Sequence, residues 1–166
     1  MKILAVSSSP RKNGNSDLLC DRFLEGAAQA GQEVEKLRLA ERDLRPCAAC
    51  CGCGETHVCV QRDGMAEALE KVLAADVIVL AVPVYFYSMA AQMKIFIDRC
   101  YPRYTEIKNK QFYFIVTAAA PPAHRSGRDH RRTAGLSAVL TRGGGEGHRL
   151  WHRGLGQGGR AAPSGL

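Results

Sequence analysis

The 166-residue sequence lacks any stretch of apolar residues long enough to cross a lipid bilayer. Its longest strongly apolar run, VIVLAVPV, covers only residues 77–84, whereas a membrane-spanning helix needs about 20 apolar residues. No signal peptide is expected, because Met1 leads directly into a strand-like pattern. These absences predict a cytoplasmic protein without a membrane partner.

A basic surface on the main part of the chain is also missing, although the formal net charge is +7. Residues 1–120 contain 15 basic and 14 acidic side chains, whereas residues 121–166 contain eight arginines and two acids. The positive charge therefore belongs to the carboxyl-terminal part, and nucleic acid is not a predicted partner. The length suits one α/β domain with a real core, and no second domain is expected.

Residues 121–166 lack Ile, Phe, Tyr, Met, Lys, Cys and Asn altogether, and they hold 11 of the 17 glycines. No useful apolar periodicity occurs there, the best segment being Leu136 to Leu140. We therefore expect a single domain over residues 1–120 and an irregular, poorly packed segment over 121–166. A disordered basic arm is one interpretation of that segment.

Strand-like and helix-like patterns alternate along residues 1–120. Short apolar or alternating runs predict strands near 2–6, 33–39, 77–83 and 110–120, and helical spacing predicts helices over 16–30, 65–75 and 89–101. The run at 77–83 is apolar on both faces, as in a central parallel strand. This alternation predicts a doubly wound parallel sheet, whose ligands sit beyond the carboxyl ends of the strands.

The loop after the first predicted strand, SSSPRKNGNS at residues 7–16, is rich in hydroxyl groups. Hydroxyls of Ser7, Ser8, Ser9 and Ser16, loop N–H groups and the following helix amino terminus suit an anion such as phosphate. Arg11 adds a forked cation. The alternative is a polar turn in which Ser16 only caps a helix. The loop contains neither G-x-G-x-x-G nor a P-loop, so a dinucleotide or triphosphate site is not implied.

A second informative stretch, PVYFYS at residues 83–88, follows the central strand. Its three adjacent aromatic rings suit a flat, partly apolar ligand at the rim of the sheet. Alternatively, Tyr85, Phe86 and Tyr87 cover the end of the sheet or form a subunit interface.

Cysteine is abundant in residues 44–63, a Cys-rich insertion called here the cysteine segment. Cys47, Cys50, Cys53 and Cys59 have the spacing C-x2-C-x2-C-x5-C, with Cys51 in addition. Four thiolates in one loop suit an iron-sulfur cluster or a zinc ion, and a redox disulfide is a third alternative. His57 is interpreted as an exposed loop residue, and Cys20 and Cys100 as helix packing residues.

These three stretches, in this order and spacing, resemble the NAD(P)H-dependent FMN reductase and iron-sulfur flavoprotein family of flavodoxin-like proteins. The matching text is SSSPRKNGNS, PCAACCGCGETHVCVQRDGM and PVYFYSMAAQMKIFIDR. The resemblance implies an FMN cofactor whose phosphate is held by Ser9, Arg11, Asn13, Asn15 and Ser16. It implies that the flavin ring is bordered by Pro83, Val84, Tyr85, Phe86, Tyr87 and Ser88. A [4Fe-4S] cluster would be ligated by Cys47, Cys50, Cys53 and Cys59.

The resemblance also implies a flavodoxin-like strand order, 2-1-3-4, with the fifth strand missing from this chain. The expected function is an FMN-dependent oxidoreductase that takes electrons from NAD(P)H and passes them to a quinone-like or protein acceptor, with or without the cluster. No catalytic acid or base is required, because the chemistry belongs to the cofactor. A homodimer or homotetramer is expected. An FMN electron carrier that does not bind NAD(P)H and a zinc-binding protein without enzymatic activity remain alternatives.

By the same resemblance, residues 121–166 are interpreted as the product of a shifted reading frame. Degenerate codons for DHRRTAGLSAVL and EGHRLWHRGLGQGG, read one nucleotide later, permit T-I-D-G-L-R-G-F-L and K-G-I-V-Y-G-T-G-A-W-D-K-G. The first is an amphipathic helix and the second a strand followed by a glycine loop, which a doubly wound fold needs after its fourth strand. The chain as written would then have reduced stability, weaker FMN retention and doubtful activity.

We predict that the nucleotide sequence shows this shift near codons 119–128. Adding or removing one base there is expected to open an uninterrupted frame that encodes a family-like carboxyl terminus. Sequencing the coding DNA across this region checks the prediction, and stop codons in both shifted frames contradict it.

Overall fold

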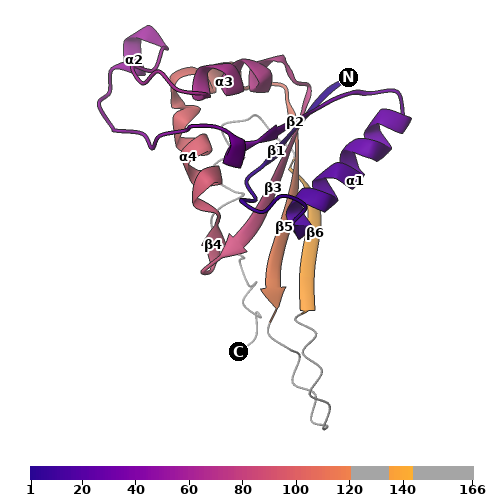
Figure 1. Cartoon of the computed structure of the whole chain (residues 1–166). Coiled ribbons are helices and arrows are strands. Elements are labelled where there is room, and N and C mark those ends of the chain that lie inside the picture. The colour runs from indigo at the N-terminus through magenta and orange to yellow at the C-terminus, as the bar shows by residue number, and fades with distance from the viewer. Residues whose placement is uncertain (121–134, 144–166) are drawn as a thin grey trace, which may run out of the picture.

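A computed structural model describes residues 1–120 and 135–143 of the chain (Figure 1). The main strands are β1 (Lys2–Ser7), β2 (Glu33–Arg38), β3 (Val77–Tyr85), β5 (Gln111–Ala120) and β6 (Gly135–Gly143), and β4 (Ser88–Met89) is a two-residue strand. The helices are α1 (Asn15–Gln29), α2 (Cys53–Thr56), α3 (Met65–Ala74) and α4 (Ala91–Arg99), with 3-10 turns η1 (Leu39–Glu41) and η2 (Tyr101–Glu106).

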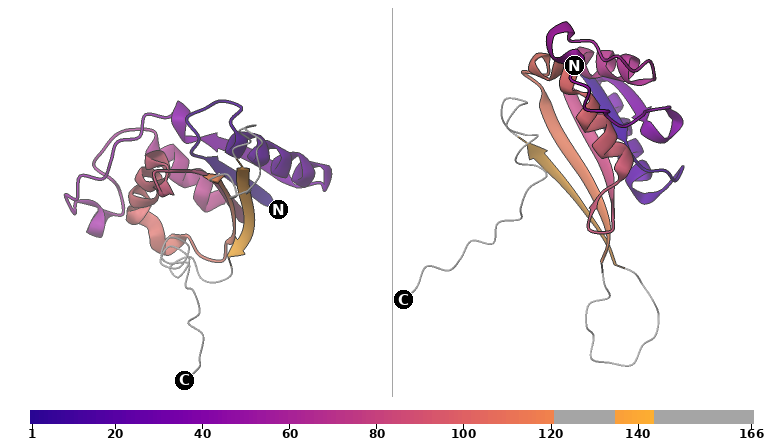
Figure 2. Two further views of the ribbon diagram at one scale, coloured as in Figure 1. Left: turned by 90° about the horizontal axis from the view of Figure 1, so that it is seen from below. Right: turned by 90° about the vertical axis from the view of Figure 1, so that its left-hand side faces the viewer.

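The sheet has the order β2-β1-β3-β5-β6, and β4 pairs with β3 outside this path. Strands β2, β1, β3 and β5 are parallel. The predicted doubly wound α/β sheet is therefore confirmed, since β5 is the fourth long strand and the first four follow the order 2-1-3-4. The connections place α1 on one face of the sheet and α3 and α4 on the other (Figure 2).

The core follows the alternation of side chains along the strands. In β3, Val77, Val79 and Ala81 point to one face, where they pack with Cys20 and Leu24 of α1. Ile78, Leu80 and Val82 point to the other face, where they pack with residues of α3 and α4 such as Leu69 and Phe96. Both faces of β3 are therefore covered, which explains its continuous apolar sequence.

The two cysteines in helices have the predicted packing role. Cys20 and Cys100 are 0% and 2% exposed, and burial raises the pKa of both thiols to about 12. Such protonated, enclosed thiols are unreactive.

The structure differs from the sequence-based expectation at residues 135–143. These residues form β6, which pairs antiparallel with β5 from Ala120↔Gly135 to Phe112↔Gly143. The outer edge of β5 is thus covered; its N–H and C=O groups offer a template for another strand. Among the described residues, no fifth parallel strand follows β5. The rest of the segment expected to be irregular lies outside the described residues.

Within the described part of the chain, no helix is long and apolar enough to cross a membrane.

Candidate functional site

The carboxyl ends of β1, β3 and β5 bring together the first two predicted site segments. The loop between β1 and α1 (residues 8–14, the β1–α1 loop) is fixed to β3, because the Ser8 N–H donates to Ala81 O over 3.0 Å. The start of α1 is fixed to β5 by a 2.9 Å hydrogen bond between Ser16 Oγ and Thr117 Oγ1. The hairpin at residues 83–88 grows from the same end of β3.

The serine hydroxyls at the start of this loop are largely committed to the protein. Ser7 Oγ donates to Asp17 Oδ1 over 3.0 Å, and Ser8 Oγ donates to Ala81 O over 3.2 Å. Ser9 Oγ donates to Arg11 O over 3.1 Å and accepts from the Arg11 N–H. A hydroxyl has one hydrogen to donate, so Ser7 and Ser8 serve the loop's structure, and Ser9 has to rotate before it can donate to a ligand.

Among the described residues, Ser16 and Thr117 keep one hydroxyl hydrogen that is not used. Both side chains are buried, and one hydrogen bond joins their two oxygens. Only one of the two hydroxyl hydrogens is used in that bond, so the other can donate to an anion. Thr117 was not among the predicted site residues. Its signal in the sequence is that it is the one Ser or Thr in β5, near the carboxyl end of the strand.

The amino terminus of α1 is open to an anion. Gly14 is its N-cap and supplies no side-chain cap, and the N–H groups of Asn15, Ser16 and Asp17 precede the first intrahelical bond. These donors and the helix dipole favour negative charge. A side chain at residue 14 would bring Cβ within 3.1 Å of Ser9 Oγ and 3.3 Å of Arg11 O, so a larger residue fits only if these atoms shift by a few tenths of an ångström.

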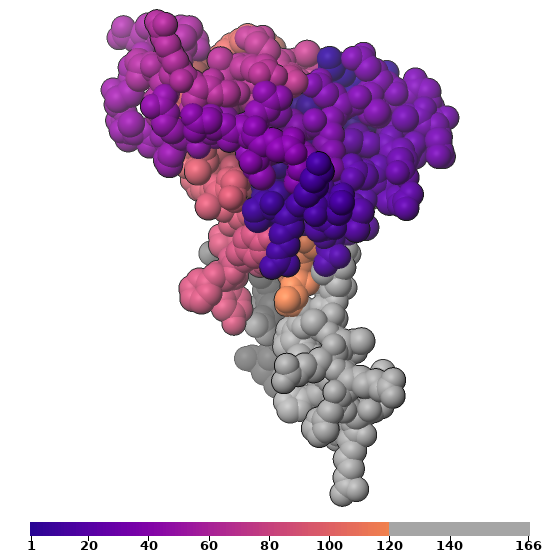
Figure 3. Space-filling model, in the orientation of Figure 1, coloured from indigo at the N-terminus to yellow at the C-terminus, as the bar shows by residue number. Residues whose placement is uncertain are grey.

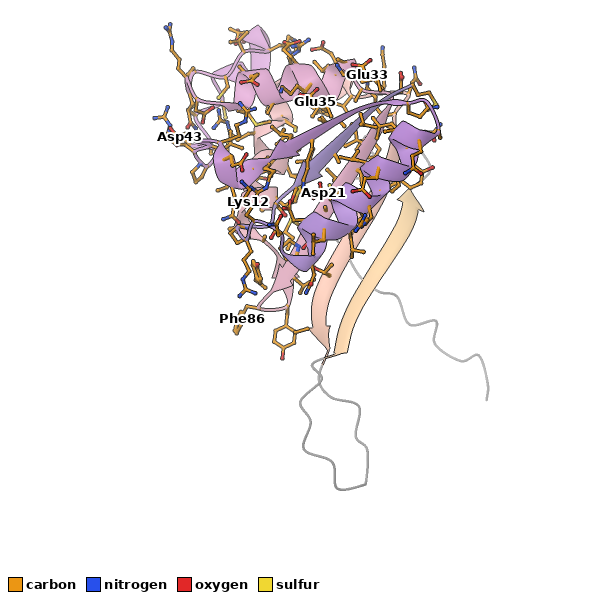
Figure 4. The ribbon with its side chains drawn as sticks, turned by 45° about the vertical axis from the view of Figure 1, so that its right-hand side comes forward. Lys12, Asp21, Glu33, Glu35, Asp43 and Phe86 are labelled. Atoms are coloured by element: carbon orange, nitrogen blue, oxygen red, sulfur yellow. The ribbon has the colours of Figure 1, made fainter. Side chains whose placement is uncertain are left out.

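The loop's cations and amides lie at its rim. Arg11, Lys12, Asn13 and Asn15 are exposed; Figure 4 labels Lys12, which lies beside the amino end of α1. Neither Arg11 nor Lys12 forms an ion pair with any residue that the structure describes. Asn13 has φ = 58°, a left-handed conformation that asparagine tolerates better than most residues.

A buried carboxylate beneath the loop, that of Asp17, holds these parts together. It accepts from Ser7 Oγ and, over 3.1 Å, from the backbone N–H of Asn13. Lys36 Nζ lies 2.9 Å and Arg38 Nε 3.4 Å from its Oδ1. Both cations come from β2, which adjoins β1 in the sheet. Sequence reasoning missed Asp17, whose only signal is an acid in the first turn of the helix.

The electrostatics of Asp17 follow from these contacts. Burial by itself raises the pKa of Asp17, but hydrogen bonds from Lys36, Ser7 and the Asn13 N–H outweigh it, and the net pKa lies below 3.8. The pKa of Lys36 shifts in the opposite direction, upward. Its burial lowers its pKa, whereas its contacts with Asp21 and Asp17 raise it above the usual value.

The hairpin at residues 83–88 presents its aromatic rings to solvent. Tyr85 pairs with Ser88 across a two-residue turn formed by Phe86 and Tyr87, which have φ values of 45° and 63°. Two-residue hairpins of this kind usually place Asn or Gly there, so two aromatic residues store strain of about 1–3 kcal/mol each. Their rings meet edge to face at 5.9 Å.

Phe86 and Tyr87 are 96% and 97% exposed, so they do not cover the end of the sheet. Figures 3 and 4 show the hairpin projecting from the body of the domain, with Phe86 at its tip. Tyr85 and Ser88 are exposed as well, Val84 is half-buried, and Pro83 is buried opposite Thr117. Of the residues predicted to border the ring, the four at 85–88 are therefore open to solvent, whereas Pro83 is held within the sheet.

The cysteine segment lies at the other end of the sheet. α2 contacts η2 through a 3.0 Å hydrogen bond between His57 Nδ1 and Pro102 O, and η2 leads into the amino end of β5. Figure 1 shows α2 and the β4 hairpin at opposite ends of the domain. Within one chain, the structure therefore brings the β1–α1 loop and the hairpin together but does not bring the cysteines to them.

The four predicted cysteine ligands lie near one another. Burial raises the pKa of the Cys53 thiol. The same pKa is raised further by the charges of three neighbouring thiols, those of Cys59, Cys47 and Cys50. In general, ionised thiols that lie close together repel one another, and a bound metal ion relieves that repulsion. Among the described residues, however, no group of three or more His, Cys, Asp or Glu side chains is arranged to hold a metal ion. Four cysteine thiols are chemically suited to bind a metal ion or an iron-sulfur cluster. Their side chains are not arranged in a coordination geometry in the described part of the chain.

We predict that Asp17→Asn lowers the free energy of unfolding at neutral pH by about 2 kcal/mol, because hydrogen bonds to a charged group are lost. Because the folded-state pKa lies below 3.8, the wild-type advantage is complete above that value and is lost as the pH falls through the folded pKa. Chemical denaturation of both proteins from neutral to acidic pH measures this difference. A difference that is independent of pH contradicts the assignment.

Comparisons with known proteins agree with this geometry. Residues 1–142 match a family model described as NADPH-dependent FMN reductase. An iron-sulfur flavoprotein of Methanocaldococcus jannaschii is 38% identical over 129 residues, which are 76% of this chain and 65% of the relative. An iron-sulfur flavoprotein of Archaeoglobus fulgidus is 40% identical over 102 residues, which are 61% of this chain and 46% of the relative. The chain thus spans less than two thirds of either relative's length.

A crystal structure of RosB with a bound flavin-derived intermediate has a similar fold. It superposes with a TM-score of 0.60 at 18% identity, covering 75% of this chain and 54% of RosB. At this identity the likeness shows the fold alone, and it agrees with the observed parallel sheet.

Proposed function

Because the chain belongs to the NADPH-dependent FMN reductase family, we propose that it is an FMN-dependent oxidoreductase that takes electrons from NAD(P)H and passes them to a quinone-like or protein acceptor. The observation that carries the proposal is the anion site at the start of α1. An uncapped helix end and a spare hydroxyl at Ser16 or Thr117 meet there. Arg11 is exposed in the same loop and forms no ion pair with any described residue. These groups suit the phosphate of a mononucleotide.

In this proposal the FMN phosphate is held by Ser9, Arg11, Asn13, Asn15 and Ser16, with Thr117 added by the structure. The flavin supplies the hydride and electron chemistry when bound. The protein contributes binding and orientation: the rigid loop fixes the phosphate, and residues 83–88 border the ring. Phe86 and Tyr87, which have no apolar cover, offer faces on which a flat ligand stacks.

The exposed rings also support assembly into a homodimer or homotetramer. Two adjacent aromatic side chains that are almost fully exposed are unfavourable in water, and an interface between copies would cover them. The seven free cysteines of the chain support a reducing, cytoplasmic location.

We further propose that Cys47, Cys50, Cys53 and Cys59 hold a [4Fe-4S] cluster. Support comes from the proximity of their thiols and from the names of the two archaeal relatives. Such a group supplies one-electron transfer when bound. Because the cysteine segment and the flavin site lie at opposite ends of the sheet, these two parts of the proposal are independent and require separate tests.

The flavin part predicts that the purified chain binds FMN and that NADPH or NADH bleaches the flavin absorbance under anaerobic conditions. Arg11→Ala is expected to weaken FMN binding at least tenfold, since a hydrogen bond to a charged group contributes about 1.5–3 kcal/mol. Arg22→Ala is the matched control, because Arg22 is an exposed cation of α1 paired with Glu25 away from the loop.

Fluorescence titration measures FMN affinity, and stopped-flow absorbance measures bleaching. If the chain fails to bind FMN, the proposal is wrong. If FMN binds but neither nucleotide bleaches it, the chain is an electron carrier and not an NAD(P)H oxidoreductase.

The cysteine part predicts iron and sulfide in chain purified without oxygen, together with a broad yellow-brown absorbance beyond that of flavin. Cys53→Ser is expected to abolish the iron, because Cys53 lies among the other three thiols, whereas Cys20→Ser leaves it in place. Metal and sulfide analysis checks this. Zinc without iron or colour would instead identify a structural zinc site.

A further inference from the structure

A buried ion pair, Asp63 with Arg99, lies at the base of the cysteine segment. Arg99, the last residue of α4, donates from two nitrogens to the two carboxylate oxygens of Asp63 over 2.7 and 2.9 Å. The two side chains are 2% and 0% exposed. Such a forked, fully enclosed pair fixes both partners in position, and it is costly to break once buried.

This pair joins both ends of the cysteine segment. Arg99 also donates to Arg45 O over 2.6 Å, and Asp63 accepts from the Arg45 N–H over 3.0 Å. Asp63 further accepts from the N–H of Met65, where α3 begins. The residues that lead into and out of the cysteines are thus tied to one point on α4. Figure 2 shows the segment extending from this side of the domain.

The guanidinium of Arg99 makes one further contact within the cysteine segment. Its Nη1 lies 3.5 Å from Oε1 of Gln61, which follows Cys59 by two residues. The hydrogen bonds with Asp63 raise the pKa of Arg99, although burial opposes this shift. The Nε–H of Arg99 is buried and has no hydrogen-bond partner within the described part of the chain.

We propose that Arg99 is a positioning residue for the cysteine segment: held by Asp63, it ties the residue that leads into the cysteines, Arg45, to the residue that follows them. This inference rests on the proposed function, in which the four cysteines between these ends are metal ligands. Fixing the two ends limits the positions that the thiols can take, and residues that orient ligands in this way strengthen metal binding.

The test compares wild type with two variants of the pair. Arg99→Lys keeps the positive charge but cannot form the two parallel hydrogen bonds to Asp63. The double variant Asp63→Asn/Arg99→Gln removes both charges, so that no unpaired carboxylate stays buried and the fold is retained. Lys94→Gln is the matched control, because Lys94 is an exposed cation of the same helix, paired with Asp98 over 2.5 Å.

Each protein is titrated anaerobically with Co²⁺, whose thiolate complexes absorb visible light, and separately with FMN. The double variant is expected to bind Co²⁺ about 10–100-fold more weakly, the usual effect of losing a residue that orients a metal ligand. FMN affinity should stay unchanged, because the flavin site lies at the other end of the sheet. Arg99→Lys is expected to bind Co²⁺ with an affinity between those of wild type and the double variant, because it keeps the charge but loses the two parallel hydrogen bonds.

A Co²⁺ affinity of the double variant within twofold of wild type overturns the role of Arg99 while leaving the cysteine site intact. Failure of the unaltered chain to bind Co²⁺ or a cluster overturns both the cysteine site and this inference. Loss of FMN binding in the double variant, but not in Lys94→Gln, shows a general structural role and also overturns it.

Discussion

The position of strand β3 in the centre of the sheet determines how the rest of the structure is arranged. It is buried on both faces and hydrogen-bonded to β1 on one side and β5 on the other. Each part of the candidate flavin site is attached to it: Ser8 bonds to Ala81, Thr117 lies in register with Pro83, and the aromatic hairpin continues from its last residues. An apolar central strand therefore does more than form the core, because its register determines which loops meet at its carboxyl end.

The geometry of the β1–α1 loop changes which groups are expected to contact a phosphate. A hydroxyl-rich sequence suggests that every serine binds the ligand, but hydrogen bonds within the fold already use those of Ser7 and Ser8. The binding capacity comes instead from the free N–H groups at the start of α1, from the shared pair Ser16 and Thr117, and from Arg11. The serines nearest the strand stabilise the loop, and the residues that follow them are the ones proposed to bind the anion.

The residue pattern was sufficient for the long strands, the three long helices and the meeting of the first two site segments, because period-2 and period-3.6 patterns are local and ligand loops of a parallel sheet share one edge. The order of the strands came from the family resemblance. It could not show Asp17 or Asp63 as structural centres, because their partners lie 19 or more residues away in the chain, on Lys36 and Arg99. Nor could it show β6, since the pairing of Gly135–Gly143 with β5 depends on an edge that exists only in the folded sheet.

The two loops proposed to bind cofactors are anchored in the same way at opposite ends of the domain. Asp17 accepts the N–H of Asn13 and faces Lys36, and Asp63 accepts the N–H of Arg45 and faces Arg99. In each case, a buried carboxylate binds one backbone group of a polar loop and is neutralised by a cation from a neighbouring element. Loops of this composition cannot bury enough apolar area to be held by packing. A charged hydrogen-bonded centre beneath each loop supplies the order that packing does not, and it leaves the outer face of each loop free for a ligand.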